Sequence, residues 1–174
     1  MEAVLSIAGS DSSGGAGIQA DIKTIAAHRL FAETAITALT AQNTLGVTGV
    51  LDVDPAFVAK QIDAVFEDIR PAAVKVGMVS SAAIIEAVAD ALERHAAANI
   101  VVDPVMVATS GARLIGDDAI EALKARLLPL ADVVTSNMPE AAVLAGFEVV
   151  DEASMERAAL RLAEAGAGAA PREG

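Results

Sequence analysis

The sequence predicts an α/β protein, a three-layer α/β/α sandwich built on a mainly parallel sheet. Short apolar runs alternate along the chain with amphipathic segments of about ten or more residues, which is the order typical of βαβ units. The run Ile100–Val102 has no polar alternation, which is typical of a strand buried on both faces. With 174 residues, the chain has the length of a single domain.

The first predicted strand, Ala3–Ala8, leads through a glycine-rich turn at residues 9–17 into a helix. Residues 34–40 are predicted to form the next strand, because their apolar positions alternate. Residues 45–53, which contain glycines and several valines, are predicted to form a short hairpin or flap. The predicted apolar face of the first helix consists of Ile18, Ile22, Ile25 and Ala26.

The second predicted helix has clear start and stop signals. Asp54 is placed as the N-cap, Pro55 occupies the first helical position, and Pro71 ends the segment. Such a helix should bury one apolar stripe against the sheet. Its predicted buried residues are Val58, Ile62, Val65, Phe66 and Ile69.

The rest of the chain continues the alternation. We predict strands at 73–76, 100–103 and 132–135, and helices at 82–96, 117–128, 139–146 and 154–165, with Ser80 or Ser81 capping the first of these helices. A low-complexity tail at 166–174 follows the last helix, with no further strand. We therefore expect residues 1–165 to form the N-terminal part of a domain whose last strands are missing.

Composition excludes several function classes. Twelve basic and twenty-four acidic residues give a net charge of −12, which argues against nucleic-acid binding and against anionic membranes. The absence of cysteine removes disulfides, thiolate metal sites and a cysteine nucleophile. No apolar run is long enough for a membrane span, and the N-terminal run is too short for a signal peptide, so a cytoplasmic protein is expected.

Polar residues follow several predicted strands, at the sheet edge where ligands bind in open α/β folds. The glycine-rich turn could bring backbone amides close to a ligand, or could be an ordinary strand-to-helix turn. Asp21 could serve a ligand or complement the helix dipole. The amide of Gln42 could read the edge of a heterocycle or simply favour a turn. Lys75 and Met78 flank a strand end and could be structural.

A second polar group lies later in the chain. Asp103 follows a strand, and Asn137 and Glu140 stand at the start of a helix. Oxygen ligands of this kind suit a hard cation such as Mg²⁺, often through water. Helix capping by Asn137 and Glu140 explains those two residues equally well without a ligand.

Taken together and in this order, the motifs closely resemble the hydroxymethylpyrimidine/phosphomethylpyrimidine kinases of thiamine biosynthesis, within the ribokinase-like superfamily. The resemblance runs from about residue 3 to about residue 164. The motifs that carry it are residues 8–21, 37–43, 74–78 and 102–106, Ser110 with Gly111, and Asn137 with Glu140.

The resemblance implies phosphorylation of 4-amino-5-hydroxymethyl-2-methylpyrimidine and then of its monophosphate, with ATP and Mg²⁺, by a homodimer. It also implies that Asp103, Asn137 and Glu140 lie near the metal and nucleotide phosphates, with Asp103 and Glu140 holding Mg²⁺ through water. The substrate-binding residues that it implies are Gly9, Ala16, Asp21, Gln42 and Met78.

The sequence also departs from the family pattern. A Lys-Gly-Gly segment and a Gly-Thr-Gly-Cys turn, which in the family contact the nucleotide and form the anion hole, are absent from these residues, and Ser136 stands where the family usually has proline. A catalytic residue is therefore not assigned, and turnover by these residues alone is expected to be negligible. Two alternatives stay open: a non-catalytic pyrimidine-binding module, and a pyridoxal-type kinase.

Overall fold

The computed structural model describes residues 1–106, 115–164 and 166, so the predicted Ser110–Gly111 motif and almost all of the 166–174 tail lie outside the described residues. A parallel five-stranded sheet forms the centre of the molecule, in the order β2-β1-β5-β6-β7. The predicted α/β class is confirmed. The strands are β1 (Ala3–Ala8), β2 (Phe31–Ile36), β5 (Ala73–Val76), β6 (Ile100–Val102) and β7 (Val133–Val134).

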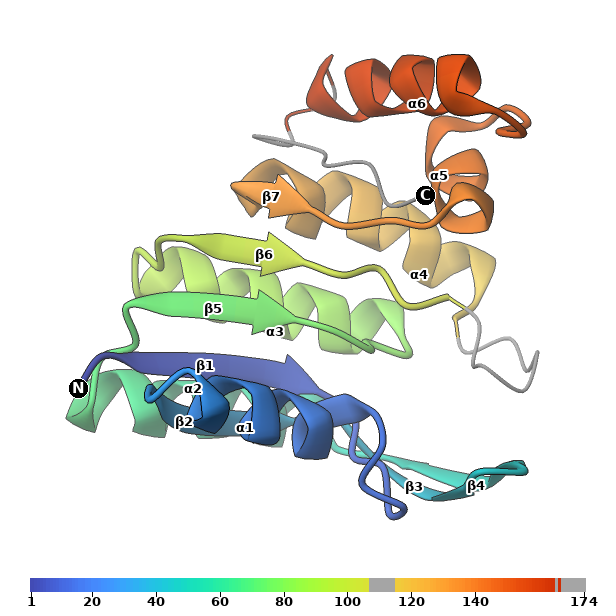
Figure 1. Ribbon diagram of the computed structural model, residues 1–174. Helices are drawn as coiled ribbons and strands as arrows, with labels where there is room; N and C mark the ends of the chain where they lie inside the picture. The colour runs from blue at the N-terminus through green and yellow to red at the C-terminus, as the bar shows by residue number, and fades with distance from the viewer. Residues whose placement is uncertain (107–114, 165, 167–174) are drawn as a thin grey trace.

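Helices lie on both faces of this sheet. Figure 1 shows α1 in front of the strands and α3 and α4 behind them. This arrangement follows from right-handed crossovers, because the chain moves outward from β1 to β2 through α1 and then returns past β1 to β5. The helices are α1 (Gly17–Ala27), α2 (Pro55–Asp68), α3 (Ala82–Arg94), α4 (Asp117–Ala122), α5 (Met138–Ala145) and α6 (Glu152–Glu164).

The structure confirms the predicted starts of α2 and α3 and the residues that cap them. The Asp54 carboxylate accepts hydrogen bonds from the amides of Ala56 and Phe57, and the Ser81 hydroxyl caps α3. The single helix predicted at 117–128 is wrong in detail. After α4 the backbone continues as a π-helical turn, Leu123–Leu127, and a 3-10 turn, Leu128–Leu130. Pro129 cannot donate a backbone hydrogen bond, which is consistent with the helix ending there.

A two-stranded antiparallel flap, β3 (Ala38–Asn43) and β4 (Gly46–Asp52), projects beyond the sheet. The single strand predicted at 34–40 is therefore wrong, because the chain leaves the sheet at Thr37. The buried Thr37 amide donates to Ala8 at 3.0 Å, and its hydroxyl donates to the Met78 carbonyl at 2.7 Å. These bonds end β2 and direct β3 into the flap.

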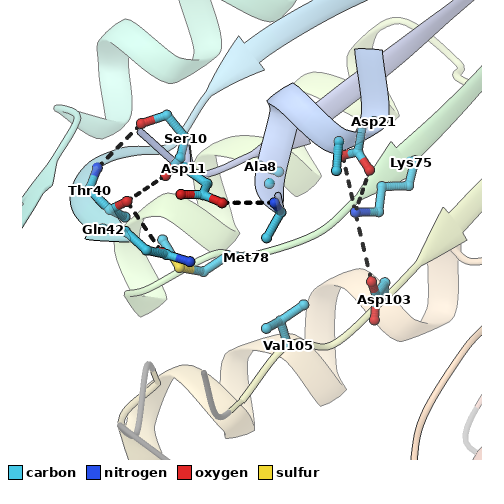
Figure 2. A pocket seen from close by; sticks show the side chains of 14 residues that line it. Ala8, Ser10, Asp11, Asp21, Thr40, Gln42, Lys75, Met78, Asp103 and Val105 are labelled. Carbon is cyan, nitrogen blue, oxygen red and sulfur yellow. Dashed lines mark hydrogen bonds and ion pairs between the residues drawn. The ribbon is translucent and has the colours of Figure 1, made fainter. Parts of the chain in front are cut away.

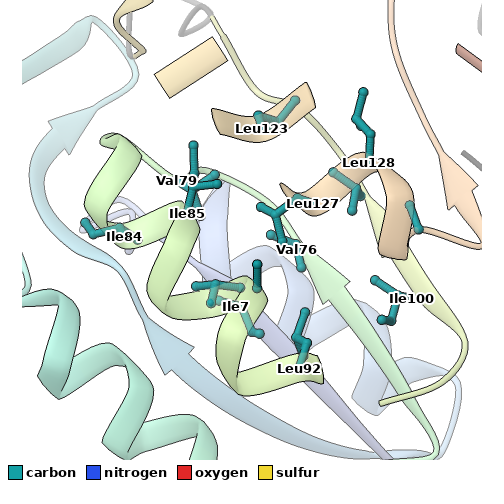
Figure 3. Close-up of a cluster of buried hydrophobic side chains, with 14 of the residues drawn as sticks. Ile7, Val76, Val79, Ile84, Ile85, Leu92, Ile100, Leu123, Leu127 and Leu128 are labelled. Carbon is teal, nitrogen blue, oxygen red and sulfur yellow. The ribbon is translucent and has the colours of Figure 1, made fainter. Parts of the chain in front are cut away.

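The apolar core lies mainly between the sheet and the helices behind it (Figure 3). Ile7 and Val76 from the strands meet Ile85 and Leu92 from α3, and all four are buried. Their close packing makes the sheet a rigid base for the loops at its carboxyl edge.

Two predicted apolar stripes are only partly buried. In α1, which packs on β1 and β2, Ile18 is buried, whereas Ile22 is 38% exposed and Ala26 is exposed. In α2, Val58, Ile62 and Phe66 are buried and Val65 is partly buried, but Ile69 is 45% exposed. Ile69 follows the last helical residue with an extended backbone, so its side chain leaves the stripe.

No helix within the described ranges combines the length and the apolar character that crossing a membrane requires.

The turn between β1 and α1 depends on one glycine. Gly17 has a φ of +55°, and a Cβ at this position would lie 2.3 Å from the Gly9 carbonyl oxygen. That carbonyl accepts the amide of Ile18 at 3.0 Å, so it cannot easily move away. The chain therefore needs the absence of a side chain at residue 17.

Gly17→Ala should lower the free energy of unfolding by at least about 2 kcal/mol, because it adds both a left-handed backbone cost and a steric clash. Gly15→Ala is the matched control. A Cβ at Gly15 would meet the Asp11 carboxylate at 3.7 Å, an ordinary contact distance. Urea unfolding of the two variants measures the difference, and equal stabilities would contradict this account of the turn.

Candidate functional site

A cavity of about 310 Å³ lies at the carboxyl ends of β1, β5 and β6 (Figure 2). The connections after β1 and β5 run in opposite directions across the sheet, so these neighbouring strands form a topological switch point. Open α/β sheets bind their ligands at such points. The topology alone therefore favours this cavity as the binding site.

The cavity brings together residues predicted from separate parts of the chain. All five predicted substrate-binding residues line it, and so does Asp103. Their assignment as substrate ligands stays a prediction, whereas their common location is a feature of the fold. The predicted residues in the lining are Gly9, Ala16, Asp21, Gln42, Met78 and Asp103.

Asp11, which sequence reasoning did not single out, organises the glycine-rich turn. Its buried carboxylate accepts the backbone amides of Ser13, Gly15 and Ala16 at 2.8–2.9 Å and the Ser13 hydroxyl at 2.8 Å. Burial would raise the pKa of Asp11, but the hydrogen bonds from Ser13, Ala16 and Gly15 outweigh burial and lower this pKa. The carboxylate is thus kept ionised and holds the turn in one shape.

The same turn is hydrogen-bonded to the flap. The Ser12 hydroxyl donates to the Gln42 carbonyl at 2.6 Å and accepts the Gln42 amide at 2.8 Å. The Thr40 hydroxyl donates to the Ser10 carbonyl at 2.8 Å. These bonds fix the backbone of β3 at Gln42, whose side chain lies beside Met78 on one side of the cavity (Figure 2).

Charged groups occupy the opposite side. The Lys75 ammonium lies 3.2 Å from the Asp21 carboxylate and 3.7 Å from that of Asp103. Asp21 also accepts the Ser6 hydroxyl at 2.6 Å. Lys75 was read from the sequence as a residue that could be structural. It stands on β5 directly opposite Ser6 of β1, and this register, which the sequence does not reveal, brings it to the site.

Asn137 and Glu140 lie outside the cavity lining and form the capping box that the sequence offered as an alternative. The Asn137 side chain accepts the Glu140 amide at 2.9 Å, and the Glu140 carboxylate accepts the Asn137 amide at 3.1 Å. Burial raises the pKa of Glu140 despite hydrogen bonds from the backbone of Asn137 and Met106, and the negative charge of Asp103 raises it further. Glu140 is therefore electrostatically coupled to the cavity through Asp103.

A predicted metal-binding role for Asp103 and Glu140 involves two carboxylates. Across the part of the chain that the structure describes, no cluster of three or more histidine, aspartate or glutamate side chains is placed to hold a metal ion. Two acidic residues can still hold Mg²⁺ when water supplies the remaining ligands. This role stays a prediction.

Known proteins match both the sequence and the fold. Residues 11–170 match the phosphomethylpyrimidine kinase family. A hydroxymethylpyrimidine/phosphomethylpyrimidine kinase from Rhizobium meliloti is 55% identical over 164 residues, which cover 94% of this chain and 61% of that protein. The chain thus spans about three fifths of the length of this relative.

Two solved structures have the same fold. The phosphomethylpyrimidine kinase of Clostridium difficile superimposes with a TM-score of 0.90 at 46% identity, over 96% of this chain and 72% of that one. A pyridoxal kinase from Staphylococcus aureus, in complex with AMP-PCP and pyridoxal, gives a TM-score of 0.84 at 35% identity, over 96% of this chain and 60% of that one.

The match over nearly the whole chain, the shared fold and the ordered motifs confirm the resemblance noted from the sequence: this chain belongs to the phosphomethylpyrimidine kinase family.

Proposed function

We propose that the cavity binds the pyrimidine acceptor of an ATP-dependent kinase, namely hydroxymethylpyrimidine and its monophosphate. The observation that carries this proposal is the convergence of Gly9, Ala16, Asp21, Gln42 and Met78 on one cavity from separate segments of the chain. The volume, about 310 Å³, is at the small end of the range for ligand pockets and suits a single substituted ring.

The chemistry of the lining supports an aminopyrimidine. The Gln42 amide offers a donor and an acceptor in one plane, and the Asp21 carboxylate can accept from an exocyclic amine. Met78 supplies a polarisable surface for the flat face of the ring. A Cβ at Gly9 would lie 2.5 Å from the Met78 methyl carbon, so glycine at this position allows Met78 its place beside the cavity.

ATP is the proposed phosphoryl donor, with Mg²⁺ as its partner ion. Asp103, half-exposed at the end of β6, and the nearby Glu140 would hold the ion through water, and Asn137 would lie close to the nucleotide. A bound Mg²⁺ would offset charge on the transferring phosphoryl group. Burial is the main cause that raises the pKa of Glu140, and the negative charge of Asp103 adds to it, so a cation near these two carboxylates would offset part of this cost.

Pyridoxal phosphorylation is a second candidate, because a pyridoxal kinase shares the fold at 35% identity. Pyridoxal carries a formyl group where the pyrimidine carries its amine, and a ring hydroxyl where the pyrimidine has a ring nitrogen. A carboxylate at Asp21 and an amide at Gln42 could serve either ring, so competition between the two ligands is needed to separate them.

We further propose that the protein acts as a homodimer in the cytoplasm and has no nucleic-acid or membrane partner. Leu39 and Leu51 pair across the flap and are 46% and 66% exposed, which supports an apolar surface for a second copy. The net charge of −12 and the absence of cysteine agree with an intracellular setting away from anionic polymers.

Gln42→Ala should weaken hydroxymethylpyrimidine binding roughly tenfold to a hundredfold, because two hydrogen bonds to the ring edge are lost. Calorimetric titration of the chain measures this. Asn43→Ala is the matched control, since the Asn43 amide accepts the Leu45 backbone amide at the flap tip and lies outside the cavity. The control should bind with nearly unchanged affinity.

Equal binding by wild type and Gln42→Ala, or no binding by wild type, would overturn the pyrimidine site. A preference of wild type for pyridoxal in the same titration would favour the second candidate. A coupled assay of the chain with ATP, Mg²⁺ and the pyrimidine should show negligible turnover, because the anion-hole turn is absent from these residues. Turnover near that of a full-length relative would contradict this expectation.

A further inference from the structure

Lys75 is the one cationic side chain among the described residues that line the cavity. Three carboxylates, those of Asp11, Asp21 and Asp103, line the same space. The Asp11 carboxylate is already matched by hydrogen bonds from its own turn. The electrostatic balance of the cavity therefore depends on how Lys75 is shared between the other two.

The fold holds Lys75 in place between those two carboxylates. In register, Lys75 of β5 stands between Ser6 of β1 and Val101 of β6, so its side chain rises from the middle of the sheet. Its ammonium reaches Asp21 at 3.2 Å and Asp103 at 3.7 Å. A Cβ at Gly77 would lie 2.8 Å from the ammonium, so glycine there leaves room for the charge.

Partial burial strengthens the electrostatic interaction between Lys75 and the carboxylates beside it. The side chains of Lys75 and Asp21 are 27% and 20% exposed, so their charges are screened less than those of a free surface pair. Without Lys75, a ligand in the cavity would lie beside the Asp21 carboxylate without the ammonium that now lies 3.2 Å from it. The loss of this positive charge would lower the binding affinity of an anion far more than that of an uncharged ligand.

We propose that Lys75 is a specificity-determining residue, which allows the cavity to accept the pyrimidine after its first phosphorylation. This inference rests on the proposed function. A phosphate monoester carries a charge of about −1.5 to −2 at neutral pH, whereas the alcohol carries none on that group. The ammonium of Lys75 offsets the two carboxylates and so lowers the repulsion that the monophosphate meets on entry.

A purely structural role for the ion pair between Lys75 and Asp21 would have a different experimental result. If Lys75 only braced Asp21, its loss would weaken the alcohol and the monophosphate by the same factor. The ratio of the two affinities is therefore the informative quantity, since it cancels any general damage to the pocket.

Calorimetric titration of both ligands, in wild type and in Lys75→Met, measures that ratio. We expect Lys75→Met to weaken binding of the monophosphate by a factor roughly ten times larger than the factor by which it weakens binding of the alcohol. Lys75→Arg keeps the charge and should keep the wild-type ratio. Lys60→Met, at an exposed position of α2 outside the cavity lining, removes the same net charge and should also leave the ratio unchanged.

The outcomes separate this inference from the proposed function. If wild type binds the alcohol and Lys75→Met shows an unchanged ratio, the role of Lys75 is overturned and the pyrimidine site stands. The same conclusion follows if wild type binds the alcohol but not the monophosphate. If wild type binds neither ligand, both proposals fail.

Wild type supplies a second measurement in case Lys75→Met does not fold. Raising sodium chloride from about 0.05 M to about 0.5 M should strengthen monophosphate binding and leave alcohol binding nearly constant, because salt screens the repulsion between the charged ligand and a chain with a net charge of −12. An equal response of the two ligands to salt would overturn the inference.

Discussion

The buried carboxylate of Asp11 shapes the wall of the cavity through its own hydrogen bonds. It accepts the amides of Ser13, Gly15 and Ala16, which would otherwise point into a tight turn without partners. The turn then places Ser12 beside the flap, where its hydroxyl is hydrogen-bonded to both the backbone carbonyl and the backbone amide of Gln42. One ionised side chain thus sets the distance between the helix α1 and the flap, and with it the width of the pocket.

The sheet positions the cavity, and charged side chains line one side of it. Because β1 and β5 are neighbours whose connections diverge, their carboxyl ends open a space that neither strand closes. Thr37 turns the chain out of the sheet at that point, and its hydroxyl donates to the Met78 carbonyl, so the start of the flap is bonded to the segment that follows β5. Lys75 then balances Asp21 and Asp103 at the floor of the same space.

Sequence patterns predicted most of the sheet, because short apolar runs alternate with amphipathic helices. The family resemblance implied that Gln42, Met78 and Asp21 share one site, although Gln42 lies in the antiparallel flap and Asp21 in α1. The break at Thr37 could not be predicted, since it depends on hydrogen bonds to Ala8 and Met78 that only the fold brings close. The role of Lys75 was missed for a similar reason. Its partners lie on α1 and after β6, far away in sequence, and a lysine in a short apolar strand has no local signal.

The central claim is that the Asp11-ordered turn, the flap and the end of β5 enclose a pyrimidine, and a crystal structure of the chain with hydroxymethylpyrimidine bound tests it most directly. The account predicts the ring between Ala16 and Met78, with the Gln42 amide on one ring edge and the Asp21 carboxylate beside the amine. A ring bound elsewhere, for example at the outer face of the flap or beside α5, with this cavity empty, would contradict it.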